Sequence, residues 1–431
     1  MNYAQTIDFL FNSVTSFQQV GADAYKPGLE RVWEFCRRLG FPQNDFLTIH
    51  VAGTNGKGSV SSMLSSVLRE AGYRVGLYTS PHLKDFRERM RVDGQMISQQ
   101  RVVEFVEQHF EDIKELQLSF FEITTAMAFD YFAASDVEVA VIETGLGGRL
   151  DATNIITPLV SVVTNIGLDH TALLGNTLQA VAAEKAGIIK SGVAVVLGEA
   201  DDRYNAVFES RSAELGSQLI YAQQNYRHLG HRVADSAQYV ALERVGSGEQ
   251  YEVKIDLLGE CQYHNVITVS TVVDYLNSAT TLTLSMRAFE RGLRSIVANS
   301  SLCGRWQVLD QSPLMVCDTG HNAHGIRYVA EQLNRLISQG VKVYCVLGFA
   351  RDKSLDEVLV LLPRQAYYLF TAADSPRSLP AEELYAVASA KGLCGEVVEG
   401  VAAALHKAQS MATAEDMIFI GGSNFVVAEI L

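Results

Sequence analysis

The sequence predicts an α/β protein with two domains, each built on a mainly parallel β-sheet. Apolar runs such as residues 46–52 and 137–142 are typical of strands that are buried on both faces of a sheet. Segments with helical periodicity separate these runs, which is the pattern of a doubly wound sheet covered by helices. The chain has 431 residues, more than one hydrophobic core usually organises.

The composition is that of an ordinary globular protein and argues against several classes of partner. Hydrophobic residues make up 48% of the chain, charged residues 19%, and the formal net charge is −14. We therefore expect neither a nucleic-acid partner nor an anionic membrane surface, because both require a basic face. We expect no membrane-spanning segment and no targeting leader, and the six cysteines show no metal-site spacing. We expect a cytoplasmic monomer with free thiols.

The elements of the first domain are expected in this order. Residues before position 46 are predicted to be helical, with one helix beginning at Pro27. A strand at 46–52 leads into a glycine-rich loop and then a helix whose apolar face runs from Val60 to Ala71. Further strands are expected at 75–79, 137–142, 159–164 and 193–197, with helical segments around 102–106 and 123–134.

The pattern changes in the middle of the chain. Residues 226–255 alternate between polar and apolar side chains, which predicts a hairpin or a small antiparallel sheet. Helices follow between residues 262 and 297, and a polar stretch at 299–301 predicts the boundary between domains 1–298 and 299–431. The second, smaller domain is predicted to be Rossmann-like, with strands at 314–317, 341–347, 367–371 and 417–420.

The loop after the first strand predicts a phosphate-binding site. It reads His50-Val51-Ala52-Gly53-Thr54-Asn55-Gly56-Lys57-Gly58-Ser59. Its glycines let backbone N–H groups converge on an anion at a helix N-terminus, and Lys57 adds a full positive charge. The loop departs from the general P-loop pattern, because Val51 replaces the first glycine and Gly58 separates Lys57 from Ser59. The alternative is a glycine-rich turn with a surface lysine.

Ser80, Glu143 and His170 each follow the carboxyl end of an expected strand. Ligands of a doubly wound sheet gather at this edge, so these residues are expected to share one crevice with the loop. Glu143 and His170 offer an oxygen and a nitrogen to a divalent metal ion, and Ser59 and Ser80 offer hydroxyl oxygens. The alternatives are a carboxylate that caps a turn and a loop histidine held by hydrogen bonds.

Several segments, in order along nearly the whole chain, resemble one enzyme family. They are the loop 53–59, Thr79-Ser80-Pro81-His82-Leu83, Phe120-Phe121-Glu122, residues 143–154, Gly167-Leu168-Asp169-His170, residues 184–190 and Asp318-Thr319-Gly320-His321-Asn322. This set is similar to the folylpolyglutamate synthase and dihydrofolate synthase family, a P-loop branch of the Mur-type amide ligases. Cell-wall Mur ligases carry a nucleotide-sugar domain ahead of their loop, and with roughly 45 residues before the loop we expect the folate branch of the family instead.

The resemblance implies a P-loop ligase that uses ATP and Mg²⁺. It places ATP at Gly53, Thr54, Asn55, Gly56, Lys57, Gly58, Ser59, Asn265, Arg305 and Asp318. It places two metal ions at Ser59, Ser80, Glu143, His170 and Lys185. It also implies that Lys185 is carbamylated, which replaces an ammonium with a carboxylate able to serve a second ion. From the residues alone, Lys185 would be an ordinary lysine on a helix surface.

The same resemblance implies where the substrate and the catalytic groups lie. The pterin ring is placed at Phe120, Phe121, Glu122, Leu150, Asp151 and Ala152, where aromatic faces suit a flat heterocycle and acidic groups suit its amino donors. The alternative for both phenylalanines is a place in the core. Lys57, Lys185, Arg305 and His321 are the expected catalytic residues. Cys261 and Ala323 depart from the family, which commonly has histidine and proline there.

The implied activity is ATP-dependent addition of L-glutamate to dihydropteroate, to the γ-carboxylate of reduced folates, or to both. The γ-phosphoryl group of ATP would activate the carboxylate as an acyl phosphate, and the amine of glutamate would then displace phosphate. One alternative is a P-loop ligase or kinase with a non-folate acceptor. Another is a nucleotide-dependent switch protein, although the sequence lacks the Asn-Lys-x-Asp motif of guanine-binding switches.

Overall fold

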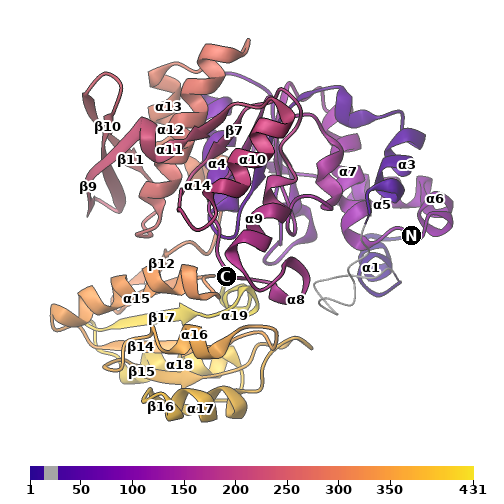
Figure 1. The fold of residues 1–431 in the computed structure, drawn as a ribbon. Coiled ribbons are helices and arrows are strands. Elements are labelled where there is room, and N and C mark those ends of the chain that lie inside the picture. The colour runs from indigo at the N-terminus through magenta and orange to yellow at the C-terminus, as the bar shows by residue number, and fades with distance from the viewer. Residues whose placement is uncertain (14–27) are drawn as a thin grey trace. The chain divides into compact units, whose positions relative to one another are not determined.

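The computed structural model describes residues 1–13 and 28–431, which divide into two compact units (Figure 1). The first unit comprises Met1–Gly167, Thr171–Asp256 and Gln262–Leu302. The second comprises Leu168–His170, Leu257–Cys261 and Cys303–Leu431. The predicted α/β class with mainly parallel sheets is confirmed in both units. The helix start expected at Pro27 lies outside the described residues, and helix α3 runs over Glu30–Arg38.

The first unit contains an eight-stranded sheet in the order β4-β3-β2-β5-β1-β6-β7-β8. Its parallel strands are β2 (Val75–Tyr78), β5 (Val139–Glu143), β1 (Leu47–Ala52), β6 (Val160–Val163), β7 (Val195–Leu197) and β8 (Leu219–Tyr221). Strands β3 (Met90–Val92) and β4 (Gln95–Met96) extend one edge in antiparallel pairing. Because β2, β5 and β1 are neighbours, the loops that leave their carboxyl ends lie at one edge of the sheet.

Helices cover this sheet, as the alternating pattern predicts. Helix α4 (Lys57–Glu70) is buried along most of its length, and α7 (Phe120–Ala134) carries apolar residues on nearly all sides. Such all-round burial is typical of helices inside a core rather than on its surface. The other longer helices of the unit are α5 (Gln99–Gln108), α9 (Leu178–Ala186), α10 (Asn205–Leu215), α12 (Gln262–Ala279) and α13 (Met286–Arg294).

A separate three-stranded antiparallel sheet belongs to the first unit. It consists of β9 (Tyr226–Ala234), β10 (Ala237–Arg244) and β11 (Glu249–Ile255), in the order β11-β10-β9. It stands beside α12 in Figure 1, and β9 packs against that helix. The small sheet predicted from the alternation of residues 226–255 is thus confirmed.

The second unit has a six-stranded sheet in the order β12-β13-β17-β14-β15-β16. The strands are β12 (Gln307–Gln311), β13 (Leu314–Asp318), β17 (Met417–Gly421), β14 (Val343–Leu347), β15 (Tyr367–Phe370) and β16 (Cys394–Val397), and all pairs except β12 with β13 are parallel. Helices α15 (Ala323–Ser338), α16 (Leu355–Leu359), α17 (Ala381–Ala390), α18 (Val401–Met411) and α19 (Asn424–Ile430) accompany it. Two apolar clusters, one around Phe419 and one around Ile418, fill its opposite faces.

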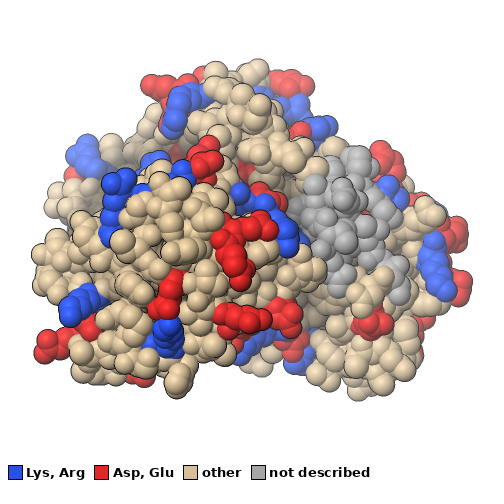
Figure 2. Space-filling model, turned by 90° about the horizontal axis from the view of Figure 1, so that it is seen from below, with Lys and Arg blue, Asp and Glu red and all other residues tan. Residues whose placement is uncertain are grey.

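The surface of the chain mixes both signs of charge. On the face drawn in Figure 2, Lys and Arg side chains are scattered among Asp and Glu side chains rather than gathered in one area. None of the helices in residues 1–13 and 28–431 combines the length and the hydropathy needed to cross a membrane.

Gly292 provides a test of how tightly α13 packs on α4. A Cβ atom at Gly292 would lie 2.5 Å from the Cα of Val67, so only glycine fits without moving a backbone. We expect Gly292→Ala to lower the unfolding free energy of the first unit by about 1 to 3 kcal/mol, because overpacking forces the two helices apart. Thermal unfolding measures this loss as a lower midpoint.

The matched control for this substitution is Gly246→Ala. A Cβ atom at Gly246 meets no other atom within 4 Å, so the control should unfold like the unmodified protein. Equal midpoints for the two variants would contradict the close packing of α13 on α4.

Candidate active site

The predicted phosphate loop joins β1 to α4 and requires glycine at two positions. Gly53 has φ 152° and Gly56 has φ 78°, backbone conformations that favour glycine. A Cβ atom at Gly53 would lie 1.8 Å from Oγ1 of Thr164, and one at Gly56 would lie 2.5 Å from Oδ1 of Asn265. The structure thus brings Asn265, at the start of α12, against the loop, where the sequence predicts a nucleotide contact.

Hydrogen bonds to the segment after β6 fix the shape of this loop. The hydroxyl of Thr54 donates to the carbonyl of Gly167 (3.0 Å) and accepts from its N–H (2.9 Å). The N–H of Asn55 donates to Oδ1 of Asn165 at 2.9 Å, and the Thr164 hydroxyl donates to the carbonyl of Asn55 at 2.5 Å. These contacts give Thr54 and Asn55 a loop-shaping role, in addition to the nucleotide contacts predicted for them.

Two lysine side chains meet at one carbonyl of the loop. Nζ of Lys57 donates to the carbonyl of Gly53 at 3.0 Å and to that of Thr54 at 3.2 Å. Nζ of Lys185, from α9, donates to the same Gly53 carbonyl at 2.8 Å, and Lys185 is 3% exposed. The structure therefore places Lys185 at the phosphate loop and not on a helix surface. Two close ammonium groups favour an anion beside them.

Oxygen donors suited to Mg²⁺ lie at the carboxyl edge of the first sheet. Glu143 ends β5 and is buried, and its Oε2 accepts a hydrogen bond from the N–H of Ser80 at 3.2 Å. Ser59 is buried in the first turn of α4, where Nε2 of Gln262 lies 3.5 Å from its hydroxyl. Carboxylate and hydroxyl oxygens are the ligand types that Mg²⁺ takes, so these side chains fit the predicted ion.

His170 belongs to the short segment Leu168–His170 that clusters with the second unit. Burial lowers the pKa of His170 to about 4, so its imidazole is neutral near pH 7, which is the form that binds metal ions. Within residues 1–13 and 28–431, no three His, Cys, Asp or Glu side chains converge in a metal-binding arrangement. The predicted set contains only two such residues, Glu143 and His170, and otherwise relies on hydroxyls and a modified lysine.

Glu122, one of the predicted pterin residues, caps α7. Its Oε2 accepts from the N–H and the hydroxyl of Ser119, at 2.7 and 2.8 Å, and its Oε1 accepts from Nε of Arg31 at 3.1 Å. Phe120 is 3% exposed, and the Arg89 guanidinium lies 5.1 Å from its ring centre. Both residues are therefore built into the first turn of the helix.

Phe121 and the loop that begins after β5 form one surface in the first unit. Phe121 is partly exposed, and a Cβ atom at Gly145 would lie 2.4 Å from Cζ of its ring. The Asp151 carboxylate holds this part of the loop, because its Oδ2 accepts from the N–H groups of Gly145 and Leu146, both at 2.8 Å. The predicted pterin residues Leu150 and Ala152 flank Asp151 in the same loop.

The predicted residues of the second unit meet around one turn. Asp318 ends β13, and its carboxylate accepts from the N–H of Trp306 and of Gly320, each at 2.7 Å. Burial raises the pKa of Asp318. Nη1 of Arg305 hydrogen-bonds to the Thr319 hydroxyl, and Nδ1 of His321 lies 2.9 Å from the Thr319 carbonyl oxygen. Arg305, Asp318 and His321 are thus close neighbours, as their predicted shared role requires.

Asp169 and Lys353 form a buried ion pair that the sequence reasoning missed. Nζ of Lys353 lies 2.6 Å from Oδ1 of Asp169, and the two side chains are 8% and 11% exposed. Nδ2 of Asn322 and Nε2 of His321 approach Oδ2 of Asp169 at 3.0 and 3.3 Å. Hydrogen bonding to His321 and the charge of Lys353 hold the pKa of Asp169 well below its usual range, although burial opposes this shift. The signal in the sequence was a charged run, Arg351-Asp352-Lys353, shortly after an apolar strand.

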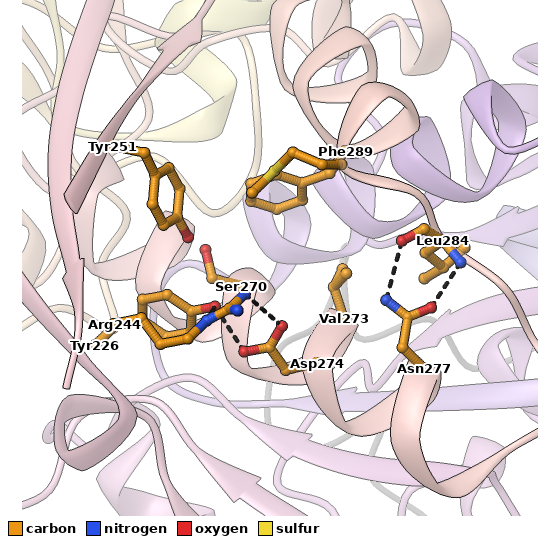
Figure 3. Close-up of a pocket in the computed structure, with 10 residues that line it drawn as sticks. Tyr226, Arg244, Tyr251, Ser270, Val273, Asp274, Asn277, Leu284 and Phe289 are labelled. Carbon is orange, nitrogen blue, oxygen red and sulfur yellow. Dashed lines mark hydrogen bonds and ion pairs between the residues drawn. The ribbon is translucent and has the colours of Figure 1, made fainter. Parts of the chain in front are cut away.

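A hollow between the small sheet, α12 and α13 is distinct from the predicted site. Figure 3 shows Arg244 and Tyr226 turned toward Asp274, and the three form a closed network with distances of 2.6 to 3.0 Å. Asn277 bonds the backbone of Leu284 with both ends of its amide. None of the predicted site residues is among those that line the hollow.

The chain matches two protein-family models that together span most of its length. Residues 51–273 match the Mur ligase middle domain, and residues 304–424 match the glutamate ligase domain of Mur ligases. The dihydrofolate synthase/folylpolyglutamate synthase of Bacillus subtilis is 33% identical over 380 residues, which is 84% of each chain. A relative from Haloferax volcanii is 35% identical over 441 residues, and the chain spans 50% of its length.

Solved structures agree with these matches. Escherichia coli FolC in complex with DHPP and ADP superposes with a TM-score of 0.84 at 29% identity, covering 100% of this chain and 97% of that one. The Yersinia pestis bifunctional folylpolyglutamate synthase/dihydrofolate synthase, complexed with AMPPNP and a Mn ion, gives the same score, identity and coverage. This chain belongs to the folylpolyglutamate synthase/dihydrofolate synthase family of Mur ligases.

Proposed function

We propose that this ATP-dependent ligase adds L-glutamate both to dihydropteroate and to the γ-carboxylate of reduced folates, through an acyl phosphate. The observation that carries the proposal is the meeting of Lys57 and Lys185 at the Gly53 carbonyl, where the loop geometry demands glycine. The ammonium group of Lys57 and the N-terminus of α4 concentrate positive charge at this loop and so favour the phosphates of ATP. The similarity to enzymes named for both activities, over 84% of this chain for the Bacillus subtilis relative and 100% for the Yersinia pestis structure, supports the choice of acceptor.

The chemistry requires activation because oxide is a poor leaving group from a carboxylate. Lys57 holds the phosphates of ATP while the γ-phosphoryl group passes to the carboxylate oxygen of the folate substrate. The amine of glutamate then attacks the acyl carbon, the bond to phosphate breaks, and the amine loses a proton. Mg²⁺, when bound, neutralises the charge of the transferred group. We assign its binding to Ser59, Ser80, Glu143, His170 and Lys185.

The second unit supplies the remaining predicted contacts to the nucleotide. Arg305 contributes a permanent positive charge suited to phosphate oxygens, and Asp318 contributes acceptors suited to ribose hydroxyls. His321 is placed beside them by Thr319 and Asp169. These assignments are proposals, as are the pterin contacts of Phe120, Phe121, Glu122, Leu150, Asp151 and Ala152.

The identity of the carboxylate acceptor is tested by measuring the release of phosphate from MgATP in the presence of L-glutamate. We expect release with dihydropteroate and with tetrahydrofolate, and negligible release without a pterin, because only a bound carboxylate accepts the phosphoryl group. Release with one acceptor alone would reduce the proposal to a single activity. If the folded protein binds ATP but releases no phosphate with either dihydropteroate or tetrahydrofolate, the folate assignment is overturned.

Carbamylation of Lys185 has its own test. We expect Lys185→Ala to lower turnover at least about 100-fold, because a group beside the phosphates and the metal is lost. Acetate or formate should restore part of the activity by supplying the missing carboxylate. ¹³C-bicarbonate NMR should show a carbamate signal in the unmodified protein and none in the variant.

Lys190→Ala is the control for the carboxylate rescue. Lys190 is partly buried, whereas Lys185 is buried; its Nζ donates to the Asn154 carbonyl at 2.7 Å, and it lies outside the predicted metal set. Acetate should leave this variant unchanged. Full activity of Lys185→Ala, or equal rescue of both variants, would contradict a carbamylated Lys185.

A further inference from the structure

His50, the first residue of the quoted loop motif, has no role in the proposed chemistry. It lies in the central strand β1 and is fully buried. Its Nε2 lies 2.8 Å from Oγ1 of Thr153, 103 positions further along the chain. Thr153 is also fully buried and belongs to the short 3₁₀ helix η5 (Ala152–Ile155), directly after Asp151. A buried polar side chain inside a parallel sheet calls for a physical reason.

The donors and acceptors fix the direction of a hydrogen-bond chain. The Thr153 hydroxyl lies 2.5 Å from Oδ1 of Asp151, and a carboxylate can only accept, so the hydroxyl proton points to Asp151. Oγ1 of Thr153 must then accept from Nε2–H of His50. This leaves Nδ1 of His50 without a hydrogen and, among the described residues, without a hydrogen-bond partner.

His50 therefore acts as a neutral donor of one defined tautomer. Burial lowers its pKa to about 3, so the ring does not take a second proton near neutral pH. Burial raises the pKa of Asp151, and the hydrogen bonds that its carboxylate accepts from Thr153, Leu146 and Gly145 oppose that shift.

The hydrogen-bond chain ends at Asp151, a residue of the predicted pterin surface. Oδ1 of Asp151 also accepts from the N–H of Thr153 at 3.1 Å, while Oδ2 accepts from the N–H groups of Gly145 and Leu146. Gly145 in turn lies against the ring of Phe121. Both oxygens of the Asp151 carboxylate are thus engaged in holding the loop, and their direction depends on the hydroxyl of Thr153.

We propose that His50 and Thr153 are positioning residues for the folate substrate, because they orient Asp151 and through it the peptide groups that support Phe121. The inference rests on the proposed function. Neither residue is a catalytic residue here, since both act through Asp151. Loss of these hydrogen bonds should weaken pterin binding equally in the ground state and the transition state, which raises KM more than it lowers kcat.

The first test compares Thr153→Val with Thr153→Ser. Valine keeps the shape and removes the hydroxyl, so we expect the KM for dihydropteroate to rise about tenfold while the KM for ATP changes less than about twofold. Serine keeps the hydroxyl and should retain the KM of the unmodified protein. Thr371→Val is the matched control, because Thr371 is equally buried but lies in the second unit.

A second pair of variants, at His50, tests the same proposal if Thr153→Val does not fold. The amide nitrogen of glutamine reaches the position of Nε2, whereas asparagine is too short, so His50→Gln should keep the KM and His50→Asn should raise it. Equal KM values for dihydropteroate within either pair of variants would overturn the proposal. An equal rise in the KM for ATP would also overturn it, and so would an equal rise in the KM for dihydropteroate in Thr371→Val. If the unmodified protein releases no phosphate with a pterin, the proposed function fails instead.

Discussion

The carbonyl oxygen of Gly53 is the point on which the arrangement of the first unit depends. It accepts hydrogen bonds from Lys57 and Lys185, which come from the helices that follow β1 and β6. Only glycine can occupy this position, because the backbone has a φ of 152° and the Thr164 hydroxyl leaves no space for a side chain. Two ammonium groups at one carbonyl repel each other, so the site is more favourable when an anion shares the charge. A phosphate group satisfies this requirement, and a carbamate on Lys185 would replace one of the positive charges with a negative one.

The sequence predicted the parts of the fold whose signal is local. The buried strands β1, β2, β5, β6 and β7 and the glycine loop were readable from runs of about five to ten residues, and the small sheet from the alternation of residues 226–255. Strands β3, β4, β8, β12 and β16 were not predicted. All five lie at a sheet edge or next to one, and β4 has two residues, both exposed. Short strands have no distinct apolar run, whether they are exposed like β4 or interrupted by a buried arginine like β3, so only their pairing defines them.

The sequence predicted site residues that directly follow the end of a strand. It did not predict pairs of residues that only the tertiary structure brings together. Glu143 and Ser80 were expected to be neighbours from sheet logic alone, and they share a hydrogen bond. The ion pair of Asp169 with Lys353 joins residues 184 positions apart. No periodicity connects such residues, and a charged run after a strand is as consistent with a solvated turn.

Several residues that carry the family resemblance are held by the protein's own hydrogen bonds. The carboxylates of Glu122 and Asp151 accept hydrogen bonds from donors of the chain itself, so they shape the surface that a ligand meets. The direction of Asp151 depends in turn on a histidine that remains neutral. A depressed pKa means that folded His50 resists protonation while the unfolded chain accepts it, so its contribution to stability is complete above about pH 6.5 and is lost as the pH falls toward about 3. Across the neutral range the hydrogen-bond chain therefore keeps one direction, and the loop that it supports keeps one shape.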